Sequence, residues 1–216
     1  MQCQHYSVLN KMKNYHHGNL KKELIEAACF LCERDGYTKL SIRSLAKESN
    51  VSQTAPYRHF KTKECVYAAV AEEGFKKLGK VTYFDPSKKI SKKNLIESCE
   101  KYIAFGLRNA HTYDLMFGTA VGKFSMYPEL LEAANSSYAN LVTNISRLTG
   151  DDTETVSAKC ITIWSIIHGL VGILRKAEMV GDDLDTSQLG PISVAQDVSK
   201  NLMPYLDKVM SGIIEN

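Results

Sequence analysis

The apolar residues of this chain recur at spacings of three and four positions, which is the period of an amphipathic α-helix. Between residues 19 and 35 the positions that follow this spacing are Leu20, Leu24, Ala28, Leu31 and Cys32. Gly36 comes directly after them, and glycine commonly ends a helix. The pattern therefore predicts a helix over 19–35, with Asn19 as its N-cap.

Three further helices are predicted before residue 80. Ser41 is suited to cap the first of them, and Asn50 is suited to the left-handed turn that ends it. Ser52 is placed to cap the second, and Thr62 or Lys63 opens the third. Two short helices joined by a tight turn form a helix-turn-helix, whose second helix can enter the major groove of DNA.

The rest of the chain continues the helical pattern after a loop over 82–91. The expected helices, given by residue range, are 91–109, 111–118, 128–148, 153–179 and 193–214. Pro128 suits the first turn of its helix, Ser193 opens the last one, and Pro204 breaks that last pattern near Met203. No segment alternates with period two, so the predicted fold class is all-α.

The composition is that of a folded, soluble chain. Of the 216 residues, 44% are hydrophobic and 24% are charged, which excludes intrinsic disorder. The longest uncharged apolar stretch, 160–174, has 15 residues, whereas a membrane-spanning helix needs ~20. The first twenty residues hold no signal peptide. We therefore expect a cytoplasmic protein that does not enter a membrane and forms no disulfide.

The net charge of +3 is unevenly distributed. Residues 1–80 hold 14 Lys and Arg against 8 Asp and Glu, whereas residues 81–216 hold 13 against 16. A basic end joined to a slightly acidic remainder is expected of a module that binds a polyanion. A solvated, lysine-rich surface would give the same count.

The segment 52–63 carries the side chains best suited to such binding. Glutamine can bond to adenine and threonine can contact the thymine methyl group. Tyrosine, histidine and lysine can hold phosphates without reading the sequence. The segment places Gln53, Thr54, Tyr57, His59 and Lys63 within one short stretch. An exposed polar helix without a partner would have a similar composition.

The stretch SIRSLAKESNVSQTAPYRHFKTKE resembles the DNA-binding domain of the TetR family of transcriptional regulators, and the resemblance extends from Leu24 to about Leu78. It implies base or phosphate contacts from Arg43, base reading by Gln53, Thr54 and Ala55, and phosphate contacts from Tyr57, His59 and Lys63. The full set of DNA-binding residues so implied is Arg43, Ser52, Gln53, Thr54, Ala55, Tyr57, Arg58, His59 and Lys63.

Pro56 departs from the leucine that most of the family carries at this position. A subgroup with Ala-Pro-Tyr here also has His-Gly-Asn before the first helix and Trp-x-x-x-His-Gly near the end. This chain has both features, at residues 17–19 and 164–169. The resemblance therefore favours that subgroup.

The family resemblance implies three parts: a flexible arm over 1–18, a helix-turn-helix domain over 19–82, and a ligand-binding and dimerisation domain over 83–216. Lys11 and Lys13 could place the arm in a minor groove, but a frayed terminus is the preferred explanation on general grounds. Small residues on one long helix and an apolar stripe on the last helix predict a dimer interface. Its residues are Ser165, Gly169, Gly172, Val198, Leu202, Leu206 and Val209. An intramolecular bundle would use the same stripes.

Within the part over 83–216, aromatic residues and methionine are concentrated ahead of the last two long helices. Such residues line apolar pockets and also fill cores. The candidate ligand-binding residues are Tyr102, Phe105, Tyr113, Met116, Phe117, Phe124, Tyr138, Trp164 and His168. Cys29 and Cys32 are separated by two residues but lack a second pair for a zinc site. We found no catalytic motif and expect no metal and no cofactor.

The sequence thus predicts a dimeric regulator, most simply a repressor, that binds a palindromic operator in double-stranded DNA. A small apolar or aromatic effector would release it. The alternative is an all-helical enzyme or small-molecule carrier with an incidental basic end.

Overall fold

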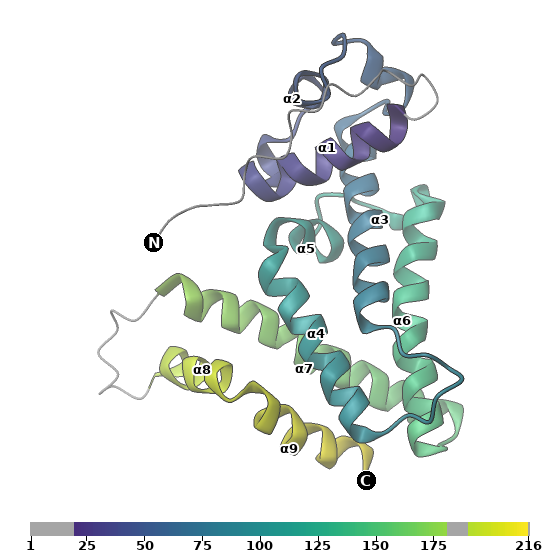
Figure 1. Cartoon of the computed structure of the whole chain (residues 1–216), viewed down its shortest axis with the longest axis vertical. Helices are drawn as coiled ribbons and strands as arrows, with labels where there is room; N and C mark the ends of the chain where they lie inside the picture. Colours follow the sequence, from purple (N-terminus) through teal and green to yellow (C-terminus); the bar gives the residue numbers. More distant parts are fainter. Residues whose placement is uncertain (1–19, 181–189, 216) are drawn as a thin grey trace.

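The computed structural model describes residues 20–180 and 190–215, and within these ranges the chain is helical with no strand (Figure 1). The all-α prediction is confirmed. The α-helices are α1 (Leu20–Asp35), α2 (Ile42–Glu48), α3 (Lys63–Thr82), α4 (Lys92–Arg108), α5 (Ala110–Phe117), α6 (Pro128–Thr149), α7 (Thr153–Val180), α8 (Pro191–Lys200) and α9 (Leu202–Ile214). Three short 3₁₀ helices are η1 (Tyr37–Lys39), η2 (Ala55–Arg58) and η3 (Phe124–Met126).

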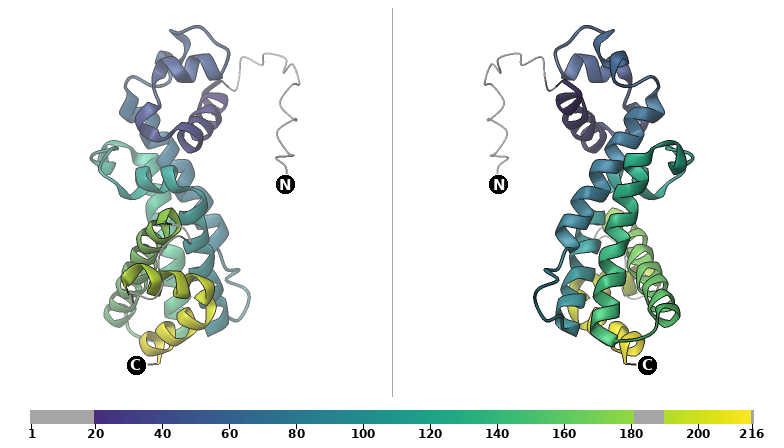
Figure 2. Two further views of the ribbon diagram at one scale, coloured as in Figure 1. Left: turned by 90° about the vertical axis from the view of Figure 1, so that its left-hand side faces the viewer. Right: turned by 90° about the vertical axis from the view of Figure 1, so that its right-hand side faces the viewer.

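The helices form two groups that α3 connects (Figures 1 and 2). The group formed by α1, α2 and η2 lies at one end of the molecule, and the larger group, α4 to α9, extends toward the other end. Helix α3 packs against α1 on one side and against α4, α5 and α6 on the other. A single long helix therefore spans both groups.

Side-chain caps explain where several helices begin. The Ser41 and Ser44 side chains form a capping box at the start of α2, and Ser91 and Asn94 form another at the start of α4. The Thr62 hydroxyl accepts a bond from the Cys65 amide at the start of α3. The starts predicted at these residues are confirmed.

The second helix of the predicted helix-turn-helix is a four-residue 3₁₀ helix, η2, and Ser52 does not cap it as predicted. Its N-cap is Thr54, which makes no capping bond, and the Ser52 hydroxyl lies 3.2 Å from that of Thr54. Pro56 occupies the first turn and donates no amide hydrogen. The amides of the two residues after η2 instead donate to the Pro56 carbonyl, at 3.0 and 2.9 Å.

The last predicted helix is two helices, and it begins earlier than Ser193. Helix α8 starts at Pro191, because proline has the φ angle of a first helical turn and needs no donor there. The chain breaks at Asn201, close to the break predicted near Met203, and α9 carries Pro204 in its first turn. The expected arm over 1–18, the Asn19 cap and the motif at 17–19 lie outside the described residues.

Helix α7 is long and apolar enough by length and composition to cross a membrane, although the sequence predicted no span. In its most apolar window 33% of the residues are buried. The helix packs against α4, α6, α8 and α9. Core helices of soluble proteins can have the same length and apolar composition, so these two properties are weak evidence for a membrane span.

Two serines at the ends of α2 give a matched prediction for stability. Ser41→Ala removes the capping side chain and is expected to lower the free energy of unfolding by about 1 kcal/mol. The Ser49 hydroxyl is buried without a hydrogen-bond partner, so we expect Ser49→Ala to be neutral or stabilising. Urea unfolding of both variants checks this, and an equal loss in both would contradict the role of the capping box.

Candidate nucleic-acid interface and ligand cavity

The residues predicted to contact DNA lie at the end of the molecule formed by α2 and η2 (Figure 1). The exposed members of this set are Arg43, Ser52, Gln53, Thr54, Tyr57, Arg58 and His59. Tyr57 is 57% exposed, whereas Pro56 and Phe60 on either side are buried. The buried pair fixes η2 to the core and leaves the polar side chains directed to solvent.

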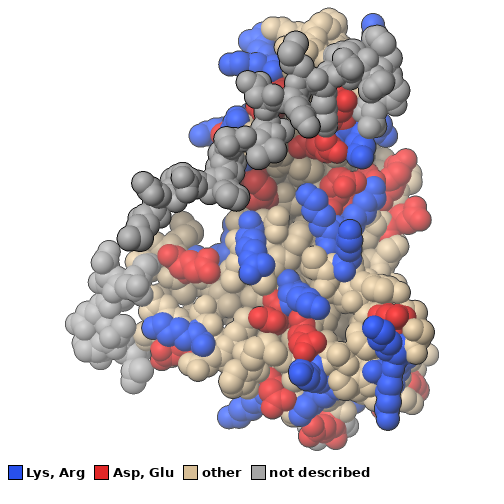
Figure 3. All heavy atoms as spheres, viewed as in Figure 1, with Lys and Arg blue, Asp and Glu red and all other residues tan. Residues whose placement is uncertain are grey.

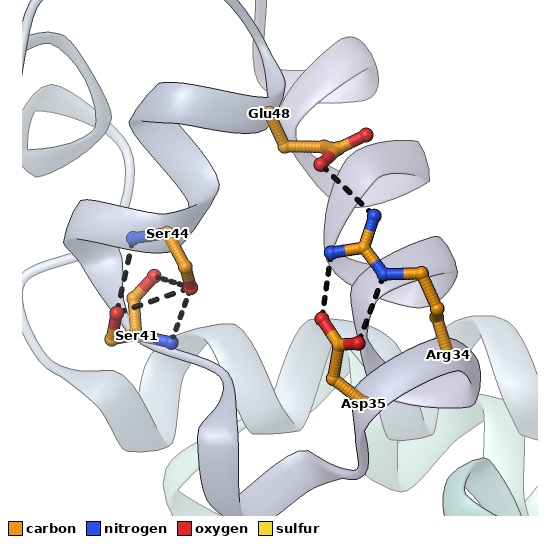
Figure 4. A network of polar contacts seen from close by, with 5 residues as sticks. All are labelled: Arg34, Asp35, Ser41, Ser44 and Glu48. Carbon is orange, nitrogen blue, oxygen red and sulfur yellow. Dashed lines mark hydrogen bonds and ion pairs between the residues drawn. The ribbon is translucent and has the colours of Figure 1, made fainter.

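An ion-pair network holds α2 against the end of α1 (Figure 4). The Arg34 guanidinium donates to both carboxylate oxygens of Asp35, at 2.9 and 2.7 Å, and lies 3.5 Å from the Glu48 carboxylate. These bonds from Arg34 lower the pKa of the Asp35 carboxyl. Because Glu48 ends α2, Arg34 helps to set the orientation in which α2 presents Arg43.

Among the described residues, Lys63 is the predicted DNA-contacting cation whose side chain already has a partner. Its ammonium group donates to the Thr38 carbonyl at 3.0 Å and lies 5.1 Å from the centre of the Tyr67 ring. The Tyr67 hydroxyl donates to the Tyr37 carbonyl at 2.7 Å. These contacts join the start of α3 to η1. An ammonium group has three donors, so Lys63 keeps capacity for a phosphate.

Charged side chains of both signs are distributed over the surface. In the face shown in Figure 3, both basic and acidic side chains lie at the upper end as well as over the lower helices. The exposed cations of α2, η2 and the segment after η2 are Arg43, Lys47, Arg58 and Lys61.

The larger group of helices encloses a cavity of about 510 Å³ between α3, α4, α5, α6 and α7. This volume lies within the range typical of small-molecule sites. Six of the nine candidate ligand-binding residues line it: Tyr102, Met116, Phe117, Phe124, Tyr138 and Trp164. Aromatic rings pack against one another here, and Phe117 lies 5.3 Å from Phe75 and 6.2 Å from Trp164 between ring centres.

The other three candidate residues do not line the cavity. Phe105 faces a different junction, beside Ile25 and Cys29 of α1. Tyr113 and His168 lie behind the cavity wall, where their rings pack against Phe117 at 4.6 and 5.0 Å between ring centres and hydrogen bonds connect them to Tyr102. The polar residues that line the cavity were not predicted from the sequence. They are Thr82, Ser98, Asn135, Ser137, Asn140 and Asn144. Their only signal was a high density of asparagine and serine along 135–144, which is typical of a solvated helix face.

A chain of hydrogen bonds connects the cavity wall to His168. The Trp164 indole donates to the Tyr102 hydroxyl at 3.1 Å, which lies 3.0 Å from the Tyr113 hydroxyl. The Tyr113 hydroxyl lies 2.7 Å from Nδ1 of His168. An indole can only donate, so Tyr102 accepts from Trp164, and either hydroxyl can donate in the contact between the two tyrosines. Burial lowers the pKa of His168 and so favours its neutral form, in which Nδ1 accepts from Tyr113 or donates to it according to the tautomer.

The pKa of His168 predicts a pH dependence of stability. Its value in the folded chain is below the ordinary 6.5, so the unfolded chain takes up a proton first as the pH falls. The folded state therefore loses stability below about pH 6.5. We expect wild type to lose more unfolding free energy than His168→Gln between pH 8 and pH 5, because glutamine does not titrate. Urea unfolding across this range measures it, and parallel curves would contradict it.

Helix α5 connects the cavity to the N-terminal helices. The Thr112 amide donates to the Glu33 carboxylate of α1 at 2.7 Å. Asp114 accepts two bonds from Arg175 of α7, at 2.7 and 3.1 Å. Met116 and Phe117 of the same helix line the cavity. One short helix thus contacts α1, α7 and the cavity.

The predicted dimer residues divide between exposed and buried positions. Ser165, Gly169 and Gly172 are exposed on α7, and a methyl group added at either glycine would meet no atom within 4 Å. Val198, Leu202 and Val209 are half-buried. Leu206 is fully buried and forms part of the core of the chain itself.

The closely spaced thiols of α1 have the properties of core side chains. Cys32 is fully buried and Cys29 half-buried. Burial raises the pKa of Cys29 to about 11 and that of Cys32 to about 12, so both are protonated at neutral pH. In the described part of the chain no three His, Cys, Asp or Glu side chains are grouped so as to hold a metal ion.

Comparison with protein families identifies both groups of helices. Residues 24–70 match the family described as bacterial regulatory proteins, tetR family. Residues 95–189 match the tetracyclin repressor-like C-terminal domain. The chain belongs to the TetR family. A search of the curated proteins gave no match.

Solved structures with the TetR fold superpose on most of the chain. A protein with unknown function from Rhodococcus sp. RHA1 is 23% identical, with a TM-score of 0.66 over 90% of this chain and 99% of that chain. A TetR variant from Acinetobacter baumannii AYE in complex with minocycline is 16% identical, with a TM-score of 0.61 over 92% and 96%. A tetR-family transcriptional regulator from Streptomyces coelicolor is 15% identical, with a TM-score of 0.60 over 89% and 88%. At these identities the likeness shows the fold.

Proposed function

We propose that this TetR-family protein is a ligand-responsive repressor that binds a palindromic operator as a homodimer. The observation that carries the proposal is the presence, in one chain, of an exposed polar surface on α2 and η2 and a partly open cavity beneath it. The DNA contacts assigned are the exposed side chains of that surface together with Lys63. In this proposal the effector is a small molecule bound in the cavity. The similar TetR variant from Acinetobacter baumannii AYE is in complex with minocycline.

The exposed face of α7 supports the homodimer. Ile161 and Ile173 are 47% and 51% exposed on this helix, close to the small residues Ser165, Gly169 and Gly172. Exposed apolar residues beside small ones allow a second helix to approach closely and bury them. A dimer also places two α2 and η2 surfaces on one duplex, as two half-sites require.

The route from cavity to DNA surface passes through α5 and α3. A ligand that displaces Met116 or Phe117 moves α5, which contacts α1 through Glu33 and packs against α3. A shift of α1 or of α3 that follows changes the separation of the two DNA surfaces. This separation must be one helical turn, roughly 34–36 Å. The effector releases DNA because it binds the form that does not fit DNA more tightly than it binds the form that does.

Binding of the purified protein to the DNA upstream of its own coding sequence tests the proposal. The control is a scrambled duplex of equal length, and both are titrated at physiological salt. We expect a saturable complex of two chains per duplex with the upstream DNA alone. A genome-wide selection of bound fragments extends the search to other sites, and equal affinity for all sequences in both experiments would contradict the proposal.

A further inference from the structure

The lining of the cavity carries no charge. None of the described residues that form its wall is Asp, Glu, Lys, Arg or His. A ligand ion placed here would lose its hydration without gaining a partner of opposite charge, and such burial is costly. The cavity therefore selects against carboxylates and against ammonium groups.

The two ends of the cavity differ in chemistry. Helices α3 and α6 run side by side in the same direction, because Tyr127 and Leu130 lie near Cys65 and Asn140 donates to the Gly79 carbonyl. The aromatic end, near the start of α6, consists of Phe75, Phe117 and Phe124. The polar end, further along both helices, consists of Thr82, Ser98 and Asn144. On α6 the lining extends from residue 134 to residue 144, which at 1.5 Å per residue is about 15 Å.

At the polar end the hydroxyl hydrogens are already used. Thr82 donates to the Leu78 carbonyl at 2.9 Å, and Ser98 donates to the Thr82 carbonyl at 3.2 Å. Asn140, one turn before, donates to Gly79. The two hydroxyls leave a ligand only lone pairs to bond with, whereas Asn140 keeps its second N–H and its carboxamide oxygen.

Asn144 is different. Its residue is 5% exposed and lines the cavity, and within the described part of the chain its carboxamide makes no hydrogen bond yet is not sealed from solvent. The carboxamide is therefore open to the cavity, and polar groups at such depth are almost always bonded. The carboxamide offers donors and an acceptor in one plane, so its natural complement is a ligand group that also pairs a donor with an acceptor.

We propose that the cavity takes an uncharged, elongated ligand with an aromatic end among Phe75, Phe117 and Phe124. Its other end presents a paired donor and acceptor, as in a primary carboxamide or a lactam, to Asn144. This assignment deepens the effector part of the proposed function and rests on it only for the consequence of binding. Occupancy itself is a property of the cavity.

A matched series of probes tests the assignment. The probes share a rigid two-ring aromatic skeleton and differ in one end group: biphenyl-4-carboxamide, biphenyl-4-carboxylate, 4-biphenylmethylammonium and 4-methylbiphenyl. Trp164 is the only tryptophan of the chain and lines the cavity, so its fluorescence reports occupancy directly. Each probe is titrated into the full-length protein without DNA.

We expect the carboxamide to bind about tenfold more tightly than the methyl compound, and the two ions to bind more weakly than either. In Asn144→Leu, which replaces the carboxamide by an apolar group of similar shape, the preference for the carboxamide over the methyl compound is lost while the methyl compound still binds. Thr143→Val is the control, because Thr143 is exposed on the same helix and does not line the cavity, so its loss leaves the preference unchanged.

Three outcomes would overturn the assignment: an ion that binds as tightly as the carboxamide, an Asn144→Leu variant that keeps the preference, or no change in Trp164 emission with any probe at millimolar concentration. The proposed function fails separately. A carboxamide that binds in the expected way but leaves affinity for the selected DNA unchanged supports the ligand class and contradicts the ligand-responsive repressor.

Discussion

Replacing Arg43 and Tyr57 together with alanine is expected to weaken binding to the selected DNA by about 2–6 kcal/mol, since each lost contact with a base or phosphate costs roughly 1–3 kcal/mol. Both side chains are exposed, so the double variant keeps its fold. Fluorescence anisotropy with a labelled duplex at fixed salt measures the loss. Unfolding curves that match wild type show that the loss lies in the interface.

A cation at the opposite end of the molecule provides the control. Lys93 on α4 is highly exposed and lies 3.9 Å from Glu97 in a surface ion pair, which contributes little to stability. Lys93→Ala removes one positive charge far from the α2 and η2 surface and is expected to leave DNA affinity nearly unchanged. Unaltered affinity in the Arg43 and Tyr57 double variant would remove this surface from the proposed interface.

The second large effect is expected at Gly106, where α4 and α7 approach most closely. A methyl group on Gly106 would lie 2.6 and 2.8 Å from the two methyl carbons of Val171, and 3.1 Å from the Tyr113 ring. Val171 is buried and β-branched, so it cannot rotate away. Overpacking costs about 1–3 kcal/mol, which exceeds the roughly 0.5–1 kcal/mol that alanine gains over glycine in a helix. Gly106→Ala therefore lowers the free energy of unfolding.

Gly79→Ala is the matched control, because Gly79 is also within a helix but its added methyl group would have no neighbour closer than 3.6 Å. This variant is expected to be more stable than wild type by about 0.5–1 kcal/mol. Val171→Ala in the Gly106→Ala background relieves the contact, so the double-mutant cycle yields a favourable coupling energy. Additive losses at the two positions would show that the close approach is absent. Chemical unfolding of all four variants gives these values.

Local chemistry made much of the fold predictable. Serines and threonines that cap helices act within three residues of their own position, so Ser41, Thr62 and Ser91 marked helix starts without knowledge of the tertiary structure. Asn50 was predicted to take up a left-handed turn, and its φ angle is 52°. The prediction at Ser52 was wrong, because the N-cap is Thr54 and a four-residue 3₁₀ helix follows it.

The cavity was only partly predictable, because its shape depends on the packing of distant helices. Aromatic residues signalled an apolar site but not which of them face it, and Phe105 and Tyr102 lie on the same helix with different neighbours. Asn144 is a polar residue on a helix with many polar positions, so no periodicity distinguishes it from a solvated side chain. The contact between Glu33 and Thr112 joins residues 79 positions apart, and no local pattern marks such a pair.

That contact also limits the dynamic range of the proposed switch. A hydrogen bond to a charged acceptor contributes roughly 1.5–3 kcal/mol, and the bond from the Thr112 amide to Glu33 is either made or exchanged for water. A ligand that acts by breaking this bond alone can therefore change the grip on DNA by about 10- to 150-fold in each subunit and no more. By reciprocity, DNA weakens the hold on the ligand by the same factor, so an operator whose affinity exceeds what its occupancy requires by more than this factor stays bound even when the effector is saturating.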